Sequence, residues 1–376
     1  MAKRVAPEEL LNGYKSNPYT VDVHRILRKM VEEKRGKEWD KRVLIPMDTF
    51  IETYCKSIGK LTGRPIMGKR LEEEYVKNNL AYILETALFT WSCTKGIYRF
   101  DDALFEELKT AEFTGYVQRS ILERIPEPCT VINIKGLFEE GFDYVMFLLN
   151  VNPITNKLCM FVILQDGETE ENFDNWDTSY FWFSLEKEAL GMEDFWNGYK
   201  LALARCEDDT EGPQLDNAYI EHEYVRLFGM QHADELSLQE KTEAISNRIR
   251  YYMKKVLPYL LYVCTYNPDI RLLTPEKALK ASPDMPKKYV VGERVGQVLR
   301  TYKTRYVTAK DGDRKTGPQK RPHFRNSYFR QQLYGPRPKG DEPDQRYHKL
   351  IWVPASYINM KGHDIFDLEP TSKTFK

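Results

Sequence analysis

Closely spaced cysteines are missing from this sequence. Its six cysteines are spread singly along 376 residues, without the short spacings of zinc sites and redox motifs. No run approaches the roughly 18 apolar residues of a membrane-spanning helix, and the first residues lack the apolar core of a signal peptide. We therefore expect a soluble, cytosolic protein with reduced thiols, no metal and no membrane partner.

An excess of one charge is also missing, since 56 basic residues balance 56 acidic ones. The net charge of zero gives no general argument for a nucleic acid or an anionic membrane. Locally the charges separate: residues 166–243 hold 21 acidic and five basic residues, and residues 287–349 hold 17 basic and six acidic ones. The two blocks could pair with each other or face separate partners, and the sequence leaves both open.

Recognisable catalytic motifs are absent as well. There is no nucleophile elbow, dinucleotide fingerprint or kinase motif, and His222 and His232 lack the spacing of a metal-binding pair. The stretch Gly292–Gly296 lacks the lysine and hydroxyl residue of a phosphate loop and does not lead from a strand into an obvious helix. We interpret it as a glycine-flanked turn in which Glu293 or Arg294 forms a buried ion pair. The absence of these motifs argues against an enzyme without excluding one, and we expect no cofactor.

The chain changes its hydrophobic period several times. Apolar spacings of three and four residues predict helices over 21–34 and 71–91, and Asp101 or Asp102 is positioned to cap a short helix that ends at Leu108. Runs rich in Val, Ile and Phe then predict strands over 129–134, 144–151, 157–165 and 178–184. Helices are expected at 192–206 and 238–266, the latter with a fully buried end. Further along the chain we predict a strand or strand pair near 289–306, and a hairpin that joins 324–333 to 346–353.

This order indicates the α+β class, with 41% hydrophobic residues available for the core. We divide the chain into a helical region at 1–125 and a region of antiparallel sheet with acidic loops and a helix at 126–235. A third region at 236–362 combines the long buried helix with a strand-poor, basic hairpin segment. Residues 363–376 are expected to form a tail.

The densest polar pattern is basic. Arg321, His323 and Arg325 occupy alternate positions and would share one face of a strand, with Arg330 close behind. Such a face suits a phosphate, a carboxylate or an RNA backbone, with Tyr328 and Tyr334 available to stack on bases. If the hairpin brings His348 near, His323 and His348 could exchange protons as in a ribonuclease. Pairing of this face with the acidic middle of the chain is the third interpretation.

Aromatic side chains gather between residues 176 and 199 beside acidic ones. Trp182, Phe183, Trp196 and Tyr199 could line an apolar groove for an extended peptide with basic flanks. Core packing would explain the same residues equally well.

Four stretches together point to a family. They are residues 256–264 with Asn267-Pro268-Asp269-Ile270, then residues 291–296 with Arg300 and Tyr302, then residues 320–325, and finally Trp352-Val353-Pro354 with Ile358 and Asn359. In order and approximate spacing, they resemble the type V-A anti-CRISPR family that blocks biosynthesis of the effector nuclease. The match is strongest over residues 256–359. After Arg325 the family pattern Arg-Gly-His-Trp is replaced by Asn326-Ser327-Tyr328-Phe329, which removes a histidine and a tryptophan.

The resemblance implies a non-enzymatic protein of a phage or plasmid that acts in the cytoplasm of a bacterial host. Its partner would be the N-terminal peptide of a type V-A CRISPR effector nuclease, bound as it leaves the ribosome, and loss of the messenger RNA would follow. We expect Arg321, His323, Arg325 and Arg330 to contact RNA or the ribosome, and Trp182, Phe183, Trp196 and Tyr199 to bind the peptide. The alternative is an RNA-binding regulator or a metal-independent ribonuclease that uses Arg321, His323 and Arg325.

Overall fold

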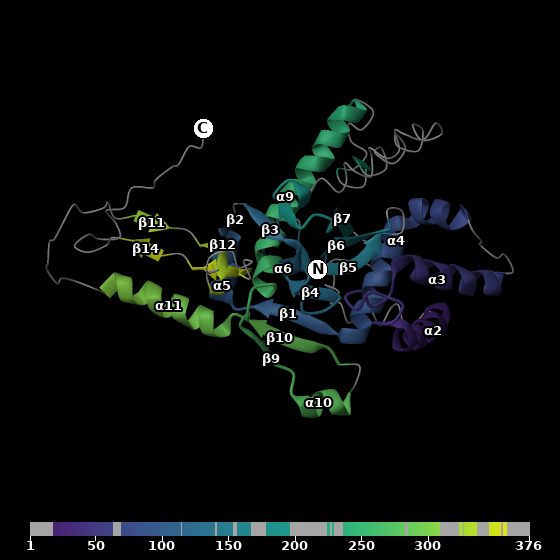
Figure 1. The fold of residues 1–376 in the computed structure, drawn as a ribbon, viewed down its shortest axis with the longest axis horizontal. Coiled ribbons are helices and arrows are strands. Elements are labelled where there is room, and N and C mark those ends of the chain that lie inside the picture. The colour runs from purple at the N-terminus through teal and green to yellow at the C-terminus, as the bar shows by residue number, and fades with distance from the viewer. Residues whose placement is uncertain are drawn as a thin grey trace.

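The structure is a computed structural model, and it confirms the α+β class. It describes residues 18–62, 69–113, 115–139, 141–152, 156–166, 178–195, 224–225, 228, 236–282, 285–308, 323–325, 327–336, 346–354 and 356–358. A mixed sheet forms the centre (Figure 1), with helices on both of its faces.

Seven strands form the central sheet in the order β7-β6-β5-β4-β1-β10-β9. Their bounds are β1 Gly96–Phe100, β4 Cys129–Asn133, β5 Phe142–Asn152, β6 Lys157–Asp166, β7 Thr178–Ser184, β9 Ile270–Leu272 and β10 Lys287–Val291. Strands β4 to β7 correspond to the four predicted strands and pair antiparallel in chain order. The pairs β1–β4 and β1–β10 are parallel, which the expected antiparallel sheet did not include.

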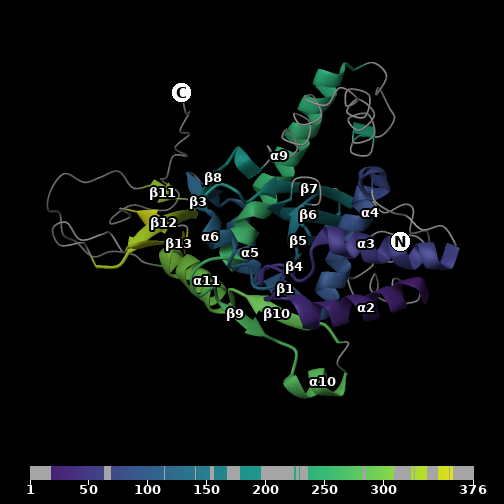
Figure 2. The ribbon, with the colours of Figure 1, turned by 45° about the vertical axis from the view of Figure 1, so that its right-hand side comes forward.

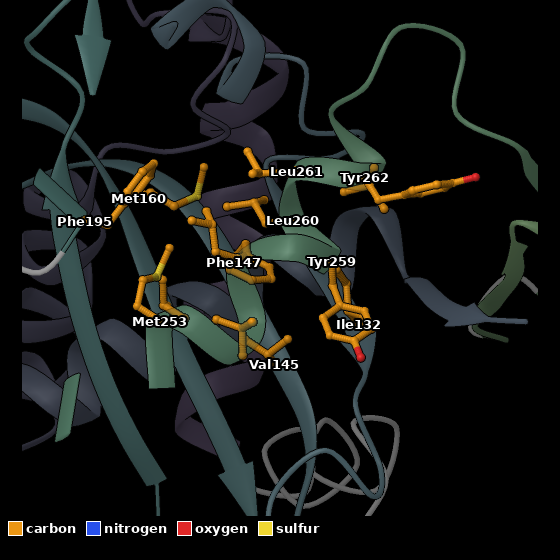
Figure 3. Packing of buried hydrophobic residues seen from close by; sticks show 14 of the residues in the cluster. Ile132, Val145, Phe147, Met160, Phe195, Met253, Tyr259, Leu260, Leu261 and Tyr262 are labelled. Carbon is orange, nitrogen blue, oxygen red and sulfur yellow. The ribbon is translucent and has the colours of Figure 1, made fainter. Parts of the chain in front are cut away.

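One face of the sheet is covered by α9 (Leu238–Val263), with α5 (Asp102–Lys109) and α6 (Arg119–Leu122) beside it. Helix α9 begins with a capping box between Ser237 and Glu240, and every residue from Val256 to Val263 is buried, which confirms the predicted buried end. Val145 and Phe147 of β5 contact this helix side, as Figure 3 shows with Tyr259 and Leu260. The alternate residues of the same strand face the other way.

The opposite face is covered by α2 (Pro18–Lys34), α3 (Met47–Thr62) and α4 (Lys69–Thr94). Met146 and Leu148 of β5 pack on this side, against helix residues such as Leu88 and Phe89. Both faces of β5 are therefore buried, which explains why its sequence is almost continuously apolar rather than alternating. The predicted helices at 21–34 and 71–91 are confirmed within α2 and α4.

The C-terminal part holds more strands than the strand-poor region that the sequence led us to expect. Strands β12 (Tyr328–Tyr334) and β13 (Tyr347–Val353) form the predicted hairpin, with Leu333 opposite His348, and β2 (Glu112–Phe113) extends their sheet. Separately, β11 (His323–Arg325) pairs with β14 (Ser356–Ile358), and β3 (Tyr116–Gln118) pairs with β8 (Ala189–Gly191). Figures 1 and 2 place β11 and β12 on the side of the molecule away from α2 and α3, and β3 nearer to the central sheet.

The segment expected to hold strands near 289–306 is mostly helix. Strand β10 ends at Val291, and α11 (Glu293–Thr308) starts two residues later, so Gly292–Gly296 does lead from a strand into a helix. The remaining helix, α10 (Glu276–Ala281), lies between β9 and β10. No helix in the described part of the chain combines the length and apolarity needed to cross a bilayer.

Candidate functional site

An open groove lies where three distant segments meet, and we call it the α9–α11 groove. Its volume is about 530 Å³. The lining comes from the end of α9 and the turn after it, from the first turns of α11, and from β13 with the residue just beyond it: Tyr262, Thr265, Tyr266, Asn267, Pro268, Asp269, Arg294, Val295, Val298, Leu350, Ile351, Trp352 and Pro354. Three of the four stretches that carry the family resemblance therefore meet in one place.

The turn after α9 is held to the start of α11 by one carboxylate. The Asp269 Oδ2 atom accepts the backbone N–H of Arg294 at 2.7 Å, and its Oδ1 atom accepts the Arg294 Nε–H at 2.8 Å. The backbone N–H of Gly292 donates to the Asp269 carbonyl at 2.6 Å. A negative charge at the first turn of α11 also interacts favourably with the helix dipole. This arrangement fixes the two sides of the groove relative to each other.

The ion pairs of this segment lie at the surface, which corrects the expected buried pair. The Arg294 side chain is 82% exposed although its partner Asp269 is only 13% exposed. Glu293 pairs with Arg271 at 2.6 Å, and both side chains are exposed. Gly292 has a φ of +77°, so the predicted glycine turn is present.

Close packing of α11 on α5 explains the rest of the glycine motif. A Cβ atom on Gly296 would lie 1.9 Å from the Asp101 Oδ1 atom, so only glycine lets the two helices approach this closely. Asp101 caps α5 by accepting the backbone N–H of Ala103 at 3.0 Å, and Arg300 donates to both of its oxygens at 2.8 and 3.1 Å. The motif residues Gly296 and Arg300 therefore position α11.

The rim of the groove is apolar and accessible. Val298 is 64% exposed and Tyr266 is 49% exposed, although both would be more stable out of water. Trp352 packs edge-on against Tyr262 with ring centroids 5.8 Å apart. Its indole Nε1–H is buried and has no hydrogen-bond partner among the described residues. Burial raises the pKa of Tyr262, so its hydroxyl, which Figure 3 shows pointing away from the sheet, stays protonated.

Strand β13 forms an edge beside the groove. Among the described strands, it pairs only with β12, within a sheet of order β13-β12-β2. On the other side, the Leu350 carbonyl accepts the backbone N–H of Tyr266 at 3.5 Å. In an antiparallel ladder alternate residues direct their backbone groups the same way, so those of His348 and Trp352 also face away from β12. An edge of this kind is suited to pairing with an extended peptide.

A cluster of tyrosines around Lys349 continues from the groove onto the hairpin. The Lys349 Nζ atom lies 3.7 Å from the ring centroid of Tyr266, 4.4 Å from that of Tyr334 and 5.3 Å from that of Tyr347. The Arg124 guanidinium lies 5.9 Å from the Tyr266 ring. Cations among exposed aromatic rings are a common feature of surfaces that bind single-stranded nucleic acid.

The predicted basic face is only partly within the described residues. Arg321 lies outside them, and His323 and Arg325 are placed at alternate positions of β11 without described side chains. Arg330 lies on β12, is exposed and donates to the Gln332 Oε1 atom at 2.8 Å.

The two histidines of the ribonuclease interpretation lie in different sheets. His323 is opposite Ile358 in the β11–β14 pair. His348 is in β13, where its Nδ1 atom is hydrogen-bonded to Gln118 Nε2 at 2.8 Å. The predicted hairpin is present, but it does not place His323 on a neighbouring strand of His348.

The predicted aromatic peptide site divides between the core and residues outside the described part. Phe183 is fully buried and packs against Phe195 at 4.9 Å, so a peptide cannot reach it in this structure. Trp182 is half-buried and packs against Phe161. Trp196 and Tyr199 lie outside the described residues. For Phe183 the core interpretation of the sequence was the right one.

Within the described residues no group of histidine, cysteine or acidic side chains could hold a metal ion. His222 and His232 lie outside them. The groove itself was missed by the sequence analysis, because its residues were read as a buried helix end and separate turns. The sequence held no signal for it, because the 64% exposure of Val298 becomes evident only once α11 is known to be a helix.

Comparison with known proteins identifies the family of this chain. The family model for the anti-CRISPR type V subtype A2 family, AcrVA2-like, matches residues 98–360. No curated protein matches. Among solved structures, the crystal structure of AcrVA2 is similar with a TM-score of 0.53 and 16% identity, over 93% of this chain and 97% of that one, and this likeness shows the fold. Because the family model covers well over half of the chain, the protein belongs to the AcrVA2-like family of type V-A anti-CRISPR proteins.

Proposed function

We propose that this anti-CRISPR protein binds the N-terminal peptide of a type V-A CRISPR effector nuclease during translation, and that loss of the messenger RNA follows. It acts as a binding protein rather than an enzyme, in the cytoplasm of a bacterial host. The observation that carries the proposal is the convergence of three family stretches, separated by up to about a hundred residues in sequence, around the α9–α11 groove.

The groove offers the features that an extended peptide requires. Val298 and Tyr266 supply exposed apolar surface, and the Trp352 indole N–H supplies a buried donor that a peptide carbonyl would satisfy. The outward backbone groups of β13 supply hydrogen bonds that do not depend on the peptide sequence. The pair Asp269–Arg294 at one wall supplies charge for selectivity. We therefore propose that the peptide binds in this groove rather than at Phe183.

The test is calorimetric titration of the full chain with synthetic peptides that cover about the first 30 residues of type V-A nucleases. Val298→Glu should weaken binding about tenfold or more, because a carboxylate would be buried against the apolar rim. Ile26→Glu is the matched control: it places the same charge on an exposed apolar position of another helix, α2. Equal affinities for Val298→Glu and Ile26→Glu would exclude the groove, and the absence of saturable binding to every peptide would exclude peptide recognition.

We assign the loss of the messenger RNA to contacts made by the basic and aromatic surface of the β12–β13 hairpin. The Lys349 tyrosine cluster and Arg330 lie on the β12–β13 hairpin, and Tyr266 joins the cluster to the groove. A peptide in the groove and RNA or the ribosome on the hairpin would therefore be neighbours.

The alternative of a metal-independent ribonuclease makes a different prediction. Purified protein would then cut RNA in the absence of ribosomes, and His348→Ala would abolish the cleavage. Under the proposed function the RNA remains whole in that assay.

A further inference from the structure

The β12–β13 hairpin (Figure 2) has two faces, and one of them belongs to the core. Phe329 and Leu350 are buried on that inner face, within the core cluster that includes α9. Side chains alternate across each strand, and residues directly opposite each other point the same way, so the intervening positions of both strands share the other face. We call it the outer face of the hairpin; it consists of Arg330, Gln332, Tyr334, Tyr347, Lys349 and Ile351.

The outer face carries aromatic rings that water can reach. Tyr347 is 49% exposed, and Tyr334, directly opposite it, is half-buried. The ring of Tyr266, from the turn after α9, reaches the same face, because the Lys349 Nζ atom lies 3.7 Å from its centroid. Tyr266 is exposed as well. Exposed rings gathered at one place are typical of an interaction surface.

The charged groups of the outer face are cations placed among these rings. Of its residues, Arg330 and Lys349 are basic and none is acidic. Arg330 is exposed and donates one N–H to the Gln332 Oε1 atom at 2.8 Å, and a guanidinium has further donors for a phosphate. Unpaired bases stack on aromatic rings while their phosphates interact with neighbouring cations. A duplex keeps its bases stacked within itself, so this face suits a single strand.

We propose that the outer face binds single-stranded messenger RNA, with bases stacked on the rings of Tyr266 and Tyr347 and phosphates at Lys349 and Arg330. The inference rests on the proposed function for RNA as the partner, and it adds the form of the RNA and the residues that hold it. Every base has a ring that can stack, so binding should depend on whether the RNA is single-stranded rather than on its sequence.

The test is the fluorescence anisotropy of a labelled single-stranded RNA of about 12 nucleotides, titrated with the full chain. An unlabelled duplex of the same sequence is the competitor, and it should compete at least about tenfold less well than the unlabelled single strand, because its bases are not available for stacking. Equal competition by the duplex would mean that the protein holds backbone charge alone, and it would overturn the proposal.

Tyr347 is the residue to vary, because it belongs to the outer face and is not among the residues that line the α9–α11 groove. Tyr347→Ala should weaken RNA binding about fivefold or more, since a stacking ring is lost, whereas Tyr347→Phe keeps the ring and should stay within about twofold. Tyr116→Ala is the matched control. Tyr116 is an exposed tyrosine of β3, and its carbonyl accepts a side-chain N–H of Gln331, on the inner face of the hairpin. Equal affinities of Tyr347→Ala and Tyr116→Ala would overturn the proposal.

Two further measurements separate this inference from the proposed function. Tyr347→Ala should bind the nuclease peptides as tightly as the original chain does, because it leaves the groove intact. If the peptides bind and no single-stranded RNA does, the inference is wrong and peptide recognition stands; if RNA binds and no peptide does, peptide recognition is wrong and the RNA site stands. Ribosomes freed of messenger should not sediment the protein through Tyr347. Sedimentation with such ribosomes that is lost in Tyr347→Ala would overturn messenger RNA as the ligand.

Discussion

Replacement of Gly292 by alanine tests whether the junction between β10 and α11 is as closely packed as the structure indicates. Gly292 has a φ of +77°, a conformation that costs a residue with a Cβ atom about 1–2 kcal/mol. The new Cβ would also lie 2.0 Å from the Cδ2 atom of Leu104, which is fully buried on α5. Relief of that overlap by displacement of the core adds about 1–3 kcal/mol. Gly292→Ala should therefore lower the free energy of unfolding by about 2–5 kcal/mol.

Gly136 provides the control that separates the two contributions. Its φ is +83°, and a Cβ atom there would meet nothing within 4 Å. Gly136→Ala therefore carries the backbone strain alone, partly offset by about 0.4–1 kcal/mol from the less flexible unfolded chain. Urea unfolding followed by tryptophan fluorescence gives both values. If Gly292→Ala were no more destabilising than Gly136→Ala, the close contact with Leu104 would be refuted.

Three further predictions concern other parts of the molecule. Burial raises the pKa of Glu127 above its ordinary value of 4.5, so the folded state holds this proton more tightly, and stability is lost as the pH rises through the folded-state pKa. In urea unfolding, Glu127→Gln should therefore be more stable than the original chain at pH 7 but not below pH 4, and an unchanged pH profile would contradict this. Phe183→Ala should cost about 3–5 kcal/mol because it empties a core position, and a loss below about 1 kcal/mol would contradict its burial. The double variant Arg321→Ala with Arg325→Ala should abolish silencing of the effector while the circular dichroism spectrum stays unchanged. If this variant still silenced the effector, contact of these two residues with RNA or the ribosome would be ruled out.

Local patterns in the sequence predicted the elements that depend on neighbouring residues. Strands β5 and β6 follow from two apolar runs, and the buried end of α9 follows from an uninterrupted apolar stretch. Helix α11 was misread because Val295, Val298 and Tyr302 favour strands by propensity. The close contact of Gly296 with Asp101, far away in the chain, packs this helix against α5, and no local pattern in the sequence reveals that contact.

The candidate site was predictable only in its parts. The resemblance named Asp269, Arg294 and Trp352, and each lies in the groove. Their meeting depends on α9, α11 and β13 arriving at one point, which is a property of the tertiary structure. The aromatic residues around Phe183 looked like a site because burial and ligand contact select the same side chains.

The parallel pair β1–β10 also sets when this protein can finish folding. Gly96 pairs with Lys287, so one edge of β1 stays without its neighbour until the ribosome has passed residue 291. Contacts between residues so far apart in sequence form late and slowly, because the entropy of closing the long intervening loop is lost before any contact is gained. A chain truncated before β10 would expose the edge of a strand whose other neighbour, β4, is already in place. An inhibitor proposed to recognise an unfinished chain thus cannot complete its own central sheet until most of its own synthesis is over.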